Sequence, residues 1–203
     1  MIKKRRIGIY GGTFNPPHTG HVGAALAFLK AVELDELLIM PAFLPPHKDY
    51  VDVVSTEDRL KMAALAFAEI EKATVSDLEI KRGGKSYTAL TLEELSSPDR
   101  ELYFLCGTDM ILTMDQWYHP ERIFELATIC YVRRETDIEN DIRISGKTNE
   151  YIKKFNARII PVPLEVTDIS SSKLRDKLLS REYTGEILPS AVYEYILEKG
   201  LYK

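Results

Sequence analysis

The stretch that decides the fold lies near the start of the chain, where residues 7–21 read IGIYGGTFNPPHTGH. Residues 7–10 form an apolar run, which predicts a buried strand ending at the Gly11-Gly12 pair. Residues 22–32 follow with the small and apolar side chains of a packed helix. A strand that passes through a glycine turn into a helix is typical of the first half of a βαβ unit.

The same alternation of apolar runs and helical patterns continues along the chain. Further strands are predicted at residues 36–40, 74–80, 102–106, 128–132 and 158–162. Further helices are predicted at residues 56–70, 89–95, 120–126, 149–155, 170–179 and 190–199. Because helices between strands act as crossover connections, we expect parallel strands with helices on both faces. The sequence therefore predicts an α/β fold, a single Rossmann-like doubly wound parallel sheet with a C-terminal helical segment, in one domain over residues 1–203.

The composition is that of an ordinary globular protein. Hydrophobic residues make up 45% of the 203 positions, and 27 basic residues against 31 acidic ones give a net charge of −4. A nucleic-acid backbone calls for a basic face, so we expect no nucleic-acid partner. The basic residues 3–6 precede an apolar stretch too short for a secretory core or a membrane span. We therefore expect a cytoplasmic protein with no membrane partner.

The two cysteines, Cys106 and Cys130, both fall in predicted strands. Buried free thiols in a reducing compartment are the plainer interpretation, and a disulfide between them is the alternative. The sequence has no CxxC pair and no cluster of cysteine and histidine with the spacing of zinc ligands. We therefore expect no metal site built from protein side chains.

Three segments rich in polar residues follow predicted strands, at residues 11–21, 107–117 and 167–175. Ligands of open α/β sheets bind at the carboxyl ends of strands, at a point where the strand order reverses. We therefore expect the three segments to meet in one site. The proline-rich residues 41–54 are expected to form an exposed loop, with a lid over that site as one interpretation.

The first of these segments has the features of a phosphate-binding loop. Its paired glycines let backbone amides approach an anion, and the N-terminus of the following helix favours negative charge. His18 and His21 are three residues apart, so on a first helical turn they share a face and can donate to phosphoryl oxygens. The alternative is a Gly/Pro loop with two incidental histidines. A dinucleotide-binding G-x-G-x-x-G does not fit, because the second glycine comes one residue late.

The segment at residues 169–175, ISSSKLR, is weaker evidence when taken alone. Serines at a helix start cap backbone amides, and the same amides can hold a phosphate. Arg175 lies one turn into the helix and could fork onto phosphate oxygens. A plain helix cap is an equal interpretation of the segment.

Together, the two segments resemble the (H/T)xGH and ISSSxxR motifs of the nucleotidyltransferase superfamily. Shorter pieces resemble bacterial nicotinate-nucleotide adenylyltransferases, namely PPHK at 45–48, SYT at 86–88, GTD at 107–109, WY at 117–118, LP at 188–189 and GLY at 200–202. The resemblance runs from the first strand to the last residues. It implies an enzyme that transfers AMP from ATP to nicotinate mononucleotide, giving deamido-NAD and pyrophosphate in NAD biosynthesis.

The resemblance also implies roles for individual residues. The catalytic residues would be His18, His21 and Arg175. The ATP site would comprise Gly11, Gly12, Thr13, Phe14, His18, His21, Gly107, Arg134, Ile169, Ser170, Ser171 and Arg175. The nicotinate mononucleotide site would comprise Lys48, Tyr87, Thr88, Asp109, Trp117 and Tyr118. Mg²⁺ is expected on ATP itself, because magnesium is often held through phosphates with few protein ligands.

Several of these assignments have a plainer structural alternative. Trp117 could stack on the pyridine ring or belong to the core. Lys48 could be a solvated loop lysine, and Arg134 a surface arginine. Asn15 stands where many family members carry aspartate, which makes it a poor candidate for an essential carboxylate. Because a turn tolerates either residue, we expect the exchange to leave catalysis intact.

Other functions stay open at this stage. Pantetheine-phosphate adenylyltransferases and cytidylyltransferases share the first motif, but the pieces at 86–88 and 117–118 count against them. A nicotinamide mononucleotide enzyme is a closer alternative, because a few backbone contacts decide between the two pyridine substituents. A nucleotide-binding regulator that has lost turnover is the alternative outside the enzymes. A monomer and a homodimer are both open.

Overall fold

The computed structural model describes residues 3–46, 54–134, 138–164, 170–180, 182 and 184–203, and in residues 133, 134 and 138–140 it describes only the backbone. Six parallel strands form one sheet in the order β3-β2-β1-β4-β5-β6. Their bounds are β1 Arg5–Gly12, β2 Glu36–Pro41, β3 Ala73–Val75, β4 Arg100–Cys106, β5 Ala127–Arg134 and β6 Ile159–Leu164. The predicted parallel, doubly wound sheet is confirmed.

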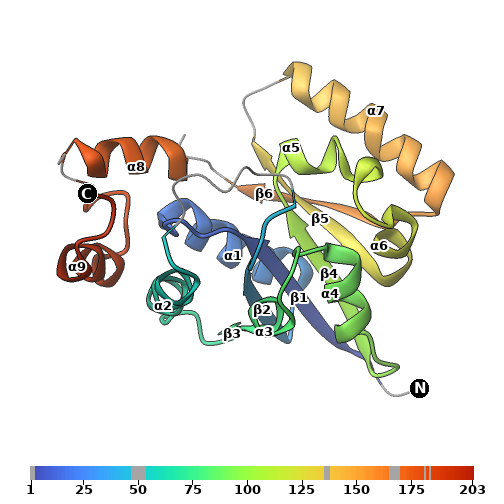
Figure 1. Ribbon diagram of the computed structural model, residues 1–203. Helices are drawn as coiled ribbons and strands as arrows, with labels where there is room; N and C mark the ends of the chain where they lie inside the picture. The colour runs from blue at the N-terminus through green and yellow to red at the C-terminus, as the bar shows by residue number, and fades with distance from the viewer. Residues whose placement is uncertain (1–2, 47–53, 135–137, 165–169, 181, 183) are drawn as a thin grey trace.

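Helices connect these strands and follow the last of them. They are α1 Thr19–Val32, α2 Thr56–Ala66, α3 Leu78–Arg82, α4 Thr88–Leu95, α5 Thr108–Ile111, the 3₁₀ helix η1 Met114–Gln116, α6 Pro120–Leu126, α7 Ile138–Phe155, α8 Ser171–Leu179 and α9 Ser190–Lys199. Figure 1 shows α8 and α9 together beside α2, while α7 lies at the far end of the sheet. The helical segment at the C-terminus therefore packs beside the half of the sheet that the N-terminus builds.

Each face of the sheet carries its own apolar core, as alternating strand residues require. On one face, the first core includes Phe28 of α1, Leu37 of β2 and Val192 of α9. On the other face, a second core includes Phe104 of β4, Phe124 of α6 and Tyr151 of α7. Helices therefore cover both faces, which confirms the layered arrangement predicted from the sequence.

Two predicted elements need correction. Residues 74–80 were expected to form one strand, but β3 stops at Val75 and α3 begins at Leu78. Ser76 turns the chain there, since its Oγ accepts a hydrogen bond from the backbone N–H of Leu78 at 3.3 Å. The helix predicted at 149–155 is the last part of α7, which begins at Ile138. Its earlier turns contain polar, β-branched and glycine residues, and packing of Ile144 against the second core offsets their low helix propensity.

The structure bears on two expectations, the free state of the cysteines and the lack of a membrane span. Cys106 and Cys130 are buried and free, as the plainer interpretation held. Burial raises the pKa of the Cys130 thiol to about 12, so this thiol stays protonated and unreactive near neutral pH. In the part of the chain that the structure describes, no helix is long and apolar enough to cross a membrane.

Candidate active site

The strand order reverses between β1 and β4, which are neighbours in the sheet although β2 and β3 separate them in the sequence. The chain leaves β1 toward one edge of the sheet and later leaves β4 toward the other edge. The crossover segments diverge at this point, and a crevice opens at the carboxyl ends of the two strands. The first loop follows β1 and Gly107 follows β4, so both lie at the reversal.

The first loop, residues 13–18, is held in an unusual backbone conformation. Phe14 has a φ of +49° and the Asn15–Pro16 peptide is cis. The Phe14 ring turns inward and makes edge-on contacts with Tyr10 and Phe67 at centroid distances of 5.5 and 5.6 Å. A Cβ at Gly12 would lie 2.9 Å from this ring, so the glycine is needed for the ring to pack. The Phe14 side chain belongs to the core, which leaves only its backbone to face a ligand.

His18 and His21 lie together at the start of α1, as their spacing predicts. The ring centroids are 3.7 Å apart, and His18 is the N-cap residue of the helix. The backbone N–H of His18 donates to Nδ1 of His21 at 3.1 Å. An acceptor at Nδ1 places the proton of a neutral imidazole on Nε2. His21 is thereby set to donate from Nε2 to an oxygen of a ligand.

His18 is more deeply placed than its partner. Its side chain is buried, and its Nδ1 atom has no hydrogen-bond partner among the residues that the structure describes. Burial lowers the pKa of His18 to about 4, so the ring is neutral at pH 7. A buried polar atom without a partner is costly, which makes this position suited to a ligand that supplies one.

The second motif lies directly against the first loop. Ser171 Oγ donates to the backbone oxygen of Pro16 at 3.1 Å, and Arg175 Nη1 donates to that of Asn15 at 2.9 Å. Ser170 caps α8 by accepting from the backbone N–H of Lys173 at 3.2 Å. The structure therefore brings together two motifs that are about 155 residues apart in the sequence. Ile169 lies outside the described residues.

Two contacts to this loop were not predicted from the sequence. The Tyr202 hydroxyl donates to the Asn15 side-chain oxygen at 2.6 Å, and Arg59 Nη1 donates to the backbone oxygen of Thr13 at 2.9 Å. Asn15 is buried, so its side chain ties the loop to the C-terminal residues. The GLY piece at 200–202 was noted only as a family resemblance, and Arg59 lies in a helix whose pattern gave no functional signal.

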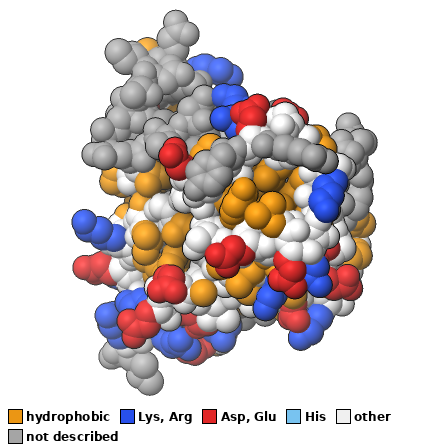
Figure 2. Space-filling model, turned by 90° about the vertical axis from the view of Figure 1, so that its left-hand side faces the viewer, with side chains coloured by type: hydrophobic (Ala, Val, Ile, Leu, Met, Phe, Trp, Pro, Cys, Tyr) orange, Lys and Arg blue, Asp and Glu red, His pale blue; other side chains and the backbone are white. Residues whose placement is uncertain are grey.

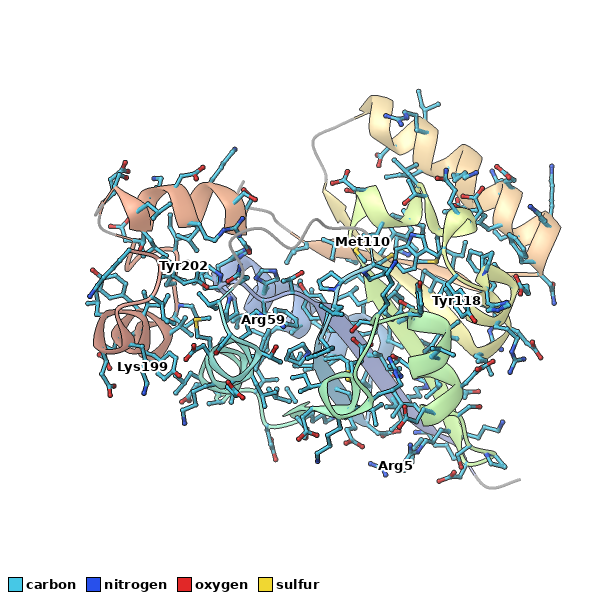
Figure 3. All side chains as sticks on the ribbon, in the orientation of Figure 1. Arg5, Arg59, Met110, Tyr118, Lys199 and Tyr202 are labelled. Atoms are coloured by element: carbon cyan, nitrogen blue, oxygen red, sulfur yellow. The ribbon has the colours of Figure 1, made fainter. Side chains whose placement is uncertain are left out.

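A cavity of about 280 Å³ lies on the other side of the first loop. Among the residues predicted for the acceptor, the cavity is lined by Tyr87, Thr88, Asp109, Trp117 and Tyr118. The glycines Gly11 and Gly12 and Thr13 line its wall toward the first loop. The two predicted half-sites therefore share a boundary. Figure 3 shows Met110 and Tyr118 at one side of the sheet and Arg59 and Tyr202 at the other.

The aromatic side chains give this cavity flat walls. Tyr87 and Tyr118 stack with centroids 4.4 Å apart and an angle of 26° between their planes. Trp117 packs edge-on against Phe104 at 6.3 Å and is 9% exposed. Trp117 was expected to be either a core residue or a wall of the acceptor site. Its ring belongs to the second core and also lines the cavity, so the two interpretations are compatible.

Tyr87 is the N-cap residue of α4, and Thr88 is the first residue of that helix. The first backbone N–H groups of a helix have no partner within it, so this end of the helix favours a negative charge. A buried carboxylate, Glu79, also lines the cavity and accepts from the Thr91 hydroxyl at 2.6 Å. Arg82 Nη2 lies 3.9 Å from Glu79, so the charge of that carboxylate is partly balanced. The sequence around Glu79 gave no functional signal.

Four predicted site residues remain, and the structure describes two of them in full and the other two in part or not at all. Gly107 is the N-cap residue of α5, where a Cβ would meet no atom within 4 Å. Asp109 is exposed in the same short helix, at the mouth of the cavity. Arg134 is the last residue of β5, but its side chain lies outside the description, as does all of Lys48. Within the described ranges, no group of three or more histidine, cysteine, aspartate or glutamate residues is arranged to hold a metal ion.

The arrangement suits a transfer between two phosphate-bearing ligands. Imidazole donors, a guanidinium and the N-terminal ends of α1 and α8 lie on one side of the first loop. An aromatic cavity large enough for a small ring lies on the other. Figure 2 views the side of the molecule on which α8, α9 and α2 lie in Figure 1, and apolar and charged side chains are mixed on that face.

Known proteins resemble this chain over most of its length. The family model described as cytidylyltransferase-like matches residues 9–177. The chain is 33% identical to a probable nicotinate-nucleotide adenylyltransferase from Shewanella baltica (strain OS185), over 97% of this chain and 99% of the relative. It is 34% identical to one from Lachnoclostridium phytofermentans, over 98% of this chain and 99% of the relative.

Solved structures share the fold. The nicotinic acid mononucleotide adenylyltransferase of Plasmodium falciparum complexed with APC superposes with a TM-score of 0.75 at 19% identity, covering 98% of this chain and 97% of that one. A putative nicotinate-nucleotide adenylyltransferase from Vibrio parahaemolyticus gives a TM-score of 0.67 at 20% identity, covering 98% and 95%.

Proposed function

The chain belongs to the nicotinate-nucleotide adenylyltransferase family, and we propose that its first loop divides the site into an ATP half and an acceptor half. On this basis the enzyme joins ATP and nicotinate mononucleotide to give deamido-NAD and pyrophosphate in NAD biosynthesis. The observation that carries the proposal is the shared boundary at Gly11, Gly12 and Thr13. The imidazoles and Arg175 lie beyond one side of the loop, and the aromatic cavity lies on the other.

In the ATP half, donors converge where negative charge would build up. His21 donates from Nε2, since its Nδ1 accepts from the backbone of His18. His18 is neutral in the free protein, and a triphosphate beside it would favour the protonated ring. Arg175 can exchange its bond to the Asn15 carbonyl for phosphate oxygens. The amides around Ser170 and Ser171, at the start of α8, would hold the β- and γ-phosphates.

The reaction needs positioning and charge neutralisation rather than a nucleophilic side chain. An oxygen of the acceptor 5′-phosphate attacks the α-phosphorus of ATP in line. The bond from that phosphorus to the bridging oxygen breaks, and pyrophosphate leaves with the electron pair. His18 and His21 stabilise the charge on the α-phosphoryl oxygens, while Arg175 stabilises the charge on the departing pyrophosphate.

In the acceptor half, the pyridine ring would lie against Trp117 in the cavity. The ring carboxylate would face the start of α4 at Thr88 and the backbone near Tyr118, where helix N–H groups favour an anion. Asp109 at the cavity mouth would accept from ribose hydroxyls. Lys48 is proposed for the acceptor phosphate and Arg134 for the adenine side, on the family resemblance alone.

Other parts of the proposal rest on the family. A divalent metal is used with ATP, and we propose Mg²⁺, held mainly through the phosphates. The metal would withdraw charge from the phosphoryl oxygens. We also propose a cytoplasmic enzyme made of one domain over residues 1–203, acting on small molecules without nucleic-acid or membrane partners, either alone or as a homodimer.

The test is to incubate the protein with Mg-ATP and, separately, with nicotinate mononucleotide, nicotinamide mononucleotide or phosphopantetheine. Pyrophosphate release and the identity of the product are followed together. We expect a strong preference for nicotinate mononucleotide. Release with another acceptor would keep the ATP half and overturn the acceptor half. No release with any acceptor, while ATP still binds, would favour a nucleotide-binding regulator.

The assignment of His18 has its own test. His18→Ala removes a donor to the reacting phosphate, so we expect kcat to fall by about 100-fold, as for the loss of one preorganised donor. The affinity for the acceptor should change little, because His18 lies outside the acceptor cavity. Lys30→Ala serves as the control, since this side chain is exposed in the last turn of the same helix. Unchanged turnover in His18→Ala would refute the assignment.

A further inference from the structure

A fully buried arginine connects the two halves of the site. Arg59 lies in the first turn of α2 and is 0% exposed. Its Nη1 donates to the backbone oxygen of Thr13 at 2.9 Å, and its Nη2 donates to the backbone oxygen of Phe43 at 3.3 Å and to Thr56 Oγ1 at 3.4 Å. Figure 3 shows Arg59 in the interior of the molecule, beside the first loop. One guanidinium therefore contacts both the first loop and the segment after β2.

The connection continues from Phe43 to the wall of the acceptor cavity. The backbone N–H of Phe43 donates to the buried Ser86 Oγ at 2.9 Å, and the backbone N–H of Ser86 donates to the oxygen of Leu44 at 2.9 Å. Ser86 directly precedes Tyr87 and Thr88, and all three line the cavity. An unbroken series of hydrogen bonds thus runs from the first loop, through Arg59 and Phe43, to the acceptor wall.

We propose that Arg59 is a positioning residue that fixes the distance between the ATP half and the acceptor half of the site. This inference rests on the proposed function and deepens it. The attacking oxygen belongs to one substrate and the α-phosphorus to the other, so the rate depends on how the two binding surfaces are placed relative to each other. The surface at Thr13 and the surface at Ser86 are held by different elements. Arg59 bonds directly to Thr13 and is linked to Ser86 through Phe43.

The chemistry of the guanidinium explains why an arginine is used. Its planar fork can donate to Thr13 and Phe43 at the same time. A lysine at this position would keep the positive charge but could not reproduce the fixed two-sided geometry. Arg59→Lys therefore separates a bridge from a simple positive charge near the phosphates, since a charge would survive the exchange and a bridge would not.

The test compares turnover with binding of each substrate alone. In Arg59→Lys we expect kcat to fall by about 10- to 100-fold, which is the loss of rate that a small misplacement of reacting groups causes. Binding of Mg-ATP alone, and of nicotinate mononucleotide alone, should each stay within about threefold in calorimetry, because neither half-site loses a ligand contact. Ser86→Ala breaks the next link without a change of charge, and we expect a fall in kcat of about fivefold, as for one hydrogen bond.

Ile70→Ala is the control for general destabilisation. Ile70 is a buried core residue just beyond α2 and does not line the cavity, so this variant should be less stable and keep its kcat. The losses in Arg59→Lys and Ser86→Ala should combine to less than their product, because both act through Phe43. Arg59→Lys combined with Ile70→Ala should show no such interaction.

Three outcomes would overturn the inference. Full kcat in Arg59→Lys would show that the charge alone matters or that the bridge has no role. A loss of ATP affinity as large as the loss of kcat would make Arg59 an ATP anchor instead. Multiplicative losses in the Arg59 and Ser86 pair would show that they do not act through one path. A wild-type protein that releases no pyrophosphate would refute the proposed function itself, a result independent of every Arg59 variant.

Discussion

The buried imidazole of His18 should make the stability of the protein depend on pH. Burial lowers the pKa of His18 to about 4 in the folded protein, against an ordinary value of 6.5. Below pH 6.5 the unfolded chain takes up a proton at this position, whereas the folded chain stays neutral until pH is near 4. The stability contributed by neutral His18 is therefore fully present above pH 6.5 and is lost as pH falls toward 4.

The magnitude follows from the difference between the two pKa values. Between the two pKa values, the free energy of unfolding falls by about 1.4 kcal/mol for each unit by which pH is lowered. Lowering pH from 7.5 to 5 should therefore reduce the free energy of unfolding by about 2 kcal/mol through His18 alone. Other groups titrate in the same range, so the relevant quantity is the difference between the wild type and His18→Asn.

The assay is guanidinium chloride unfolding of both proteins at pH 7.5 and at pH 5. We expect the wild type to lose about 2 kcal/mol more than His18→Asn between the two conditions, whatever their stabilities at pH 7.5. Measuring at both pH values in the same buffer series cancels effects of the substitution that do not depend on pH. Equal losses in the two proteins would refute the reasoning, because they would mean that His18 titrates alike in the folded and unfolded states.

Two further predictions concern packing and the first loop. A Cβ at Gly8 would lie 2.4 Å from a methyl group of the fully buried Leu34, so Gly8→Ala should cost about 1–3 kcal/mol in chemical unfolding. Gly23→Ala is its matched control in α1, where the nearest atom is 3.7 Å away, and it should stabilise by about 0.5–1 kcal/mol; a loss of similar size in both would contradict the steric reason. Tyr202→Phe removes the 2.6 Å hydrogen bond to Asn15 and should lower stability by about 1–2 kcal/mol in thermal unfolding. Asn15→Asp keeps an acceptor for the same hydroxyl, so it should retain turnover, and a loss of turnover there would show that the amide has a specific role.

Much of the site could be predicted because its chemistry is local in the chain. His18 is the N-cap residue and His21 the third residue of α1, and these two positions come close together at the start of a helix wherever the helix lies. Gly12 was expected to leave room for a backbone approach, and the structure shows that it also leaves room for the Phe14 ring. Local polymer geometry is the same in every fold, so such features can be read from the residues.

The elements that were predicted wrongly are those whose local signal is weak. Residues 74–80 combine β-branched and apolar residues, but the edge position of β3 and the turn at Ser76 end the strand at Val75. The first turns of α7 have little helix propensity, and contacts with the second core stabilise them. A local turn therefore decided the outcome at residues 74–80, and packing against the rest of the protein decided it in α7.

By itself, the sequence determined the alternation of strands and helices, the Gly/Pro-rich loop at the end of β1 and the family to which the chain is similar. Only the tertiary structure decided that Arg175 and Tyr202 meet Asn15, and that Arg59 reaches both Thr13 and Phe43. The physical reason is distance along the chain. Spacing within a turn or helix is set by covalent geometry and local hydrogen bonds, whereas contacts between residues 160 or 187 positions apart depend on strand order and on how each helix packs.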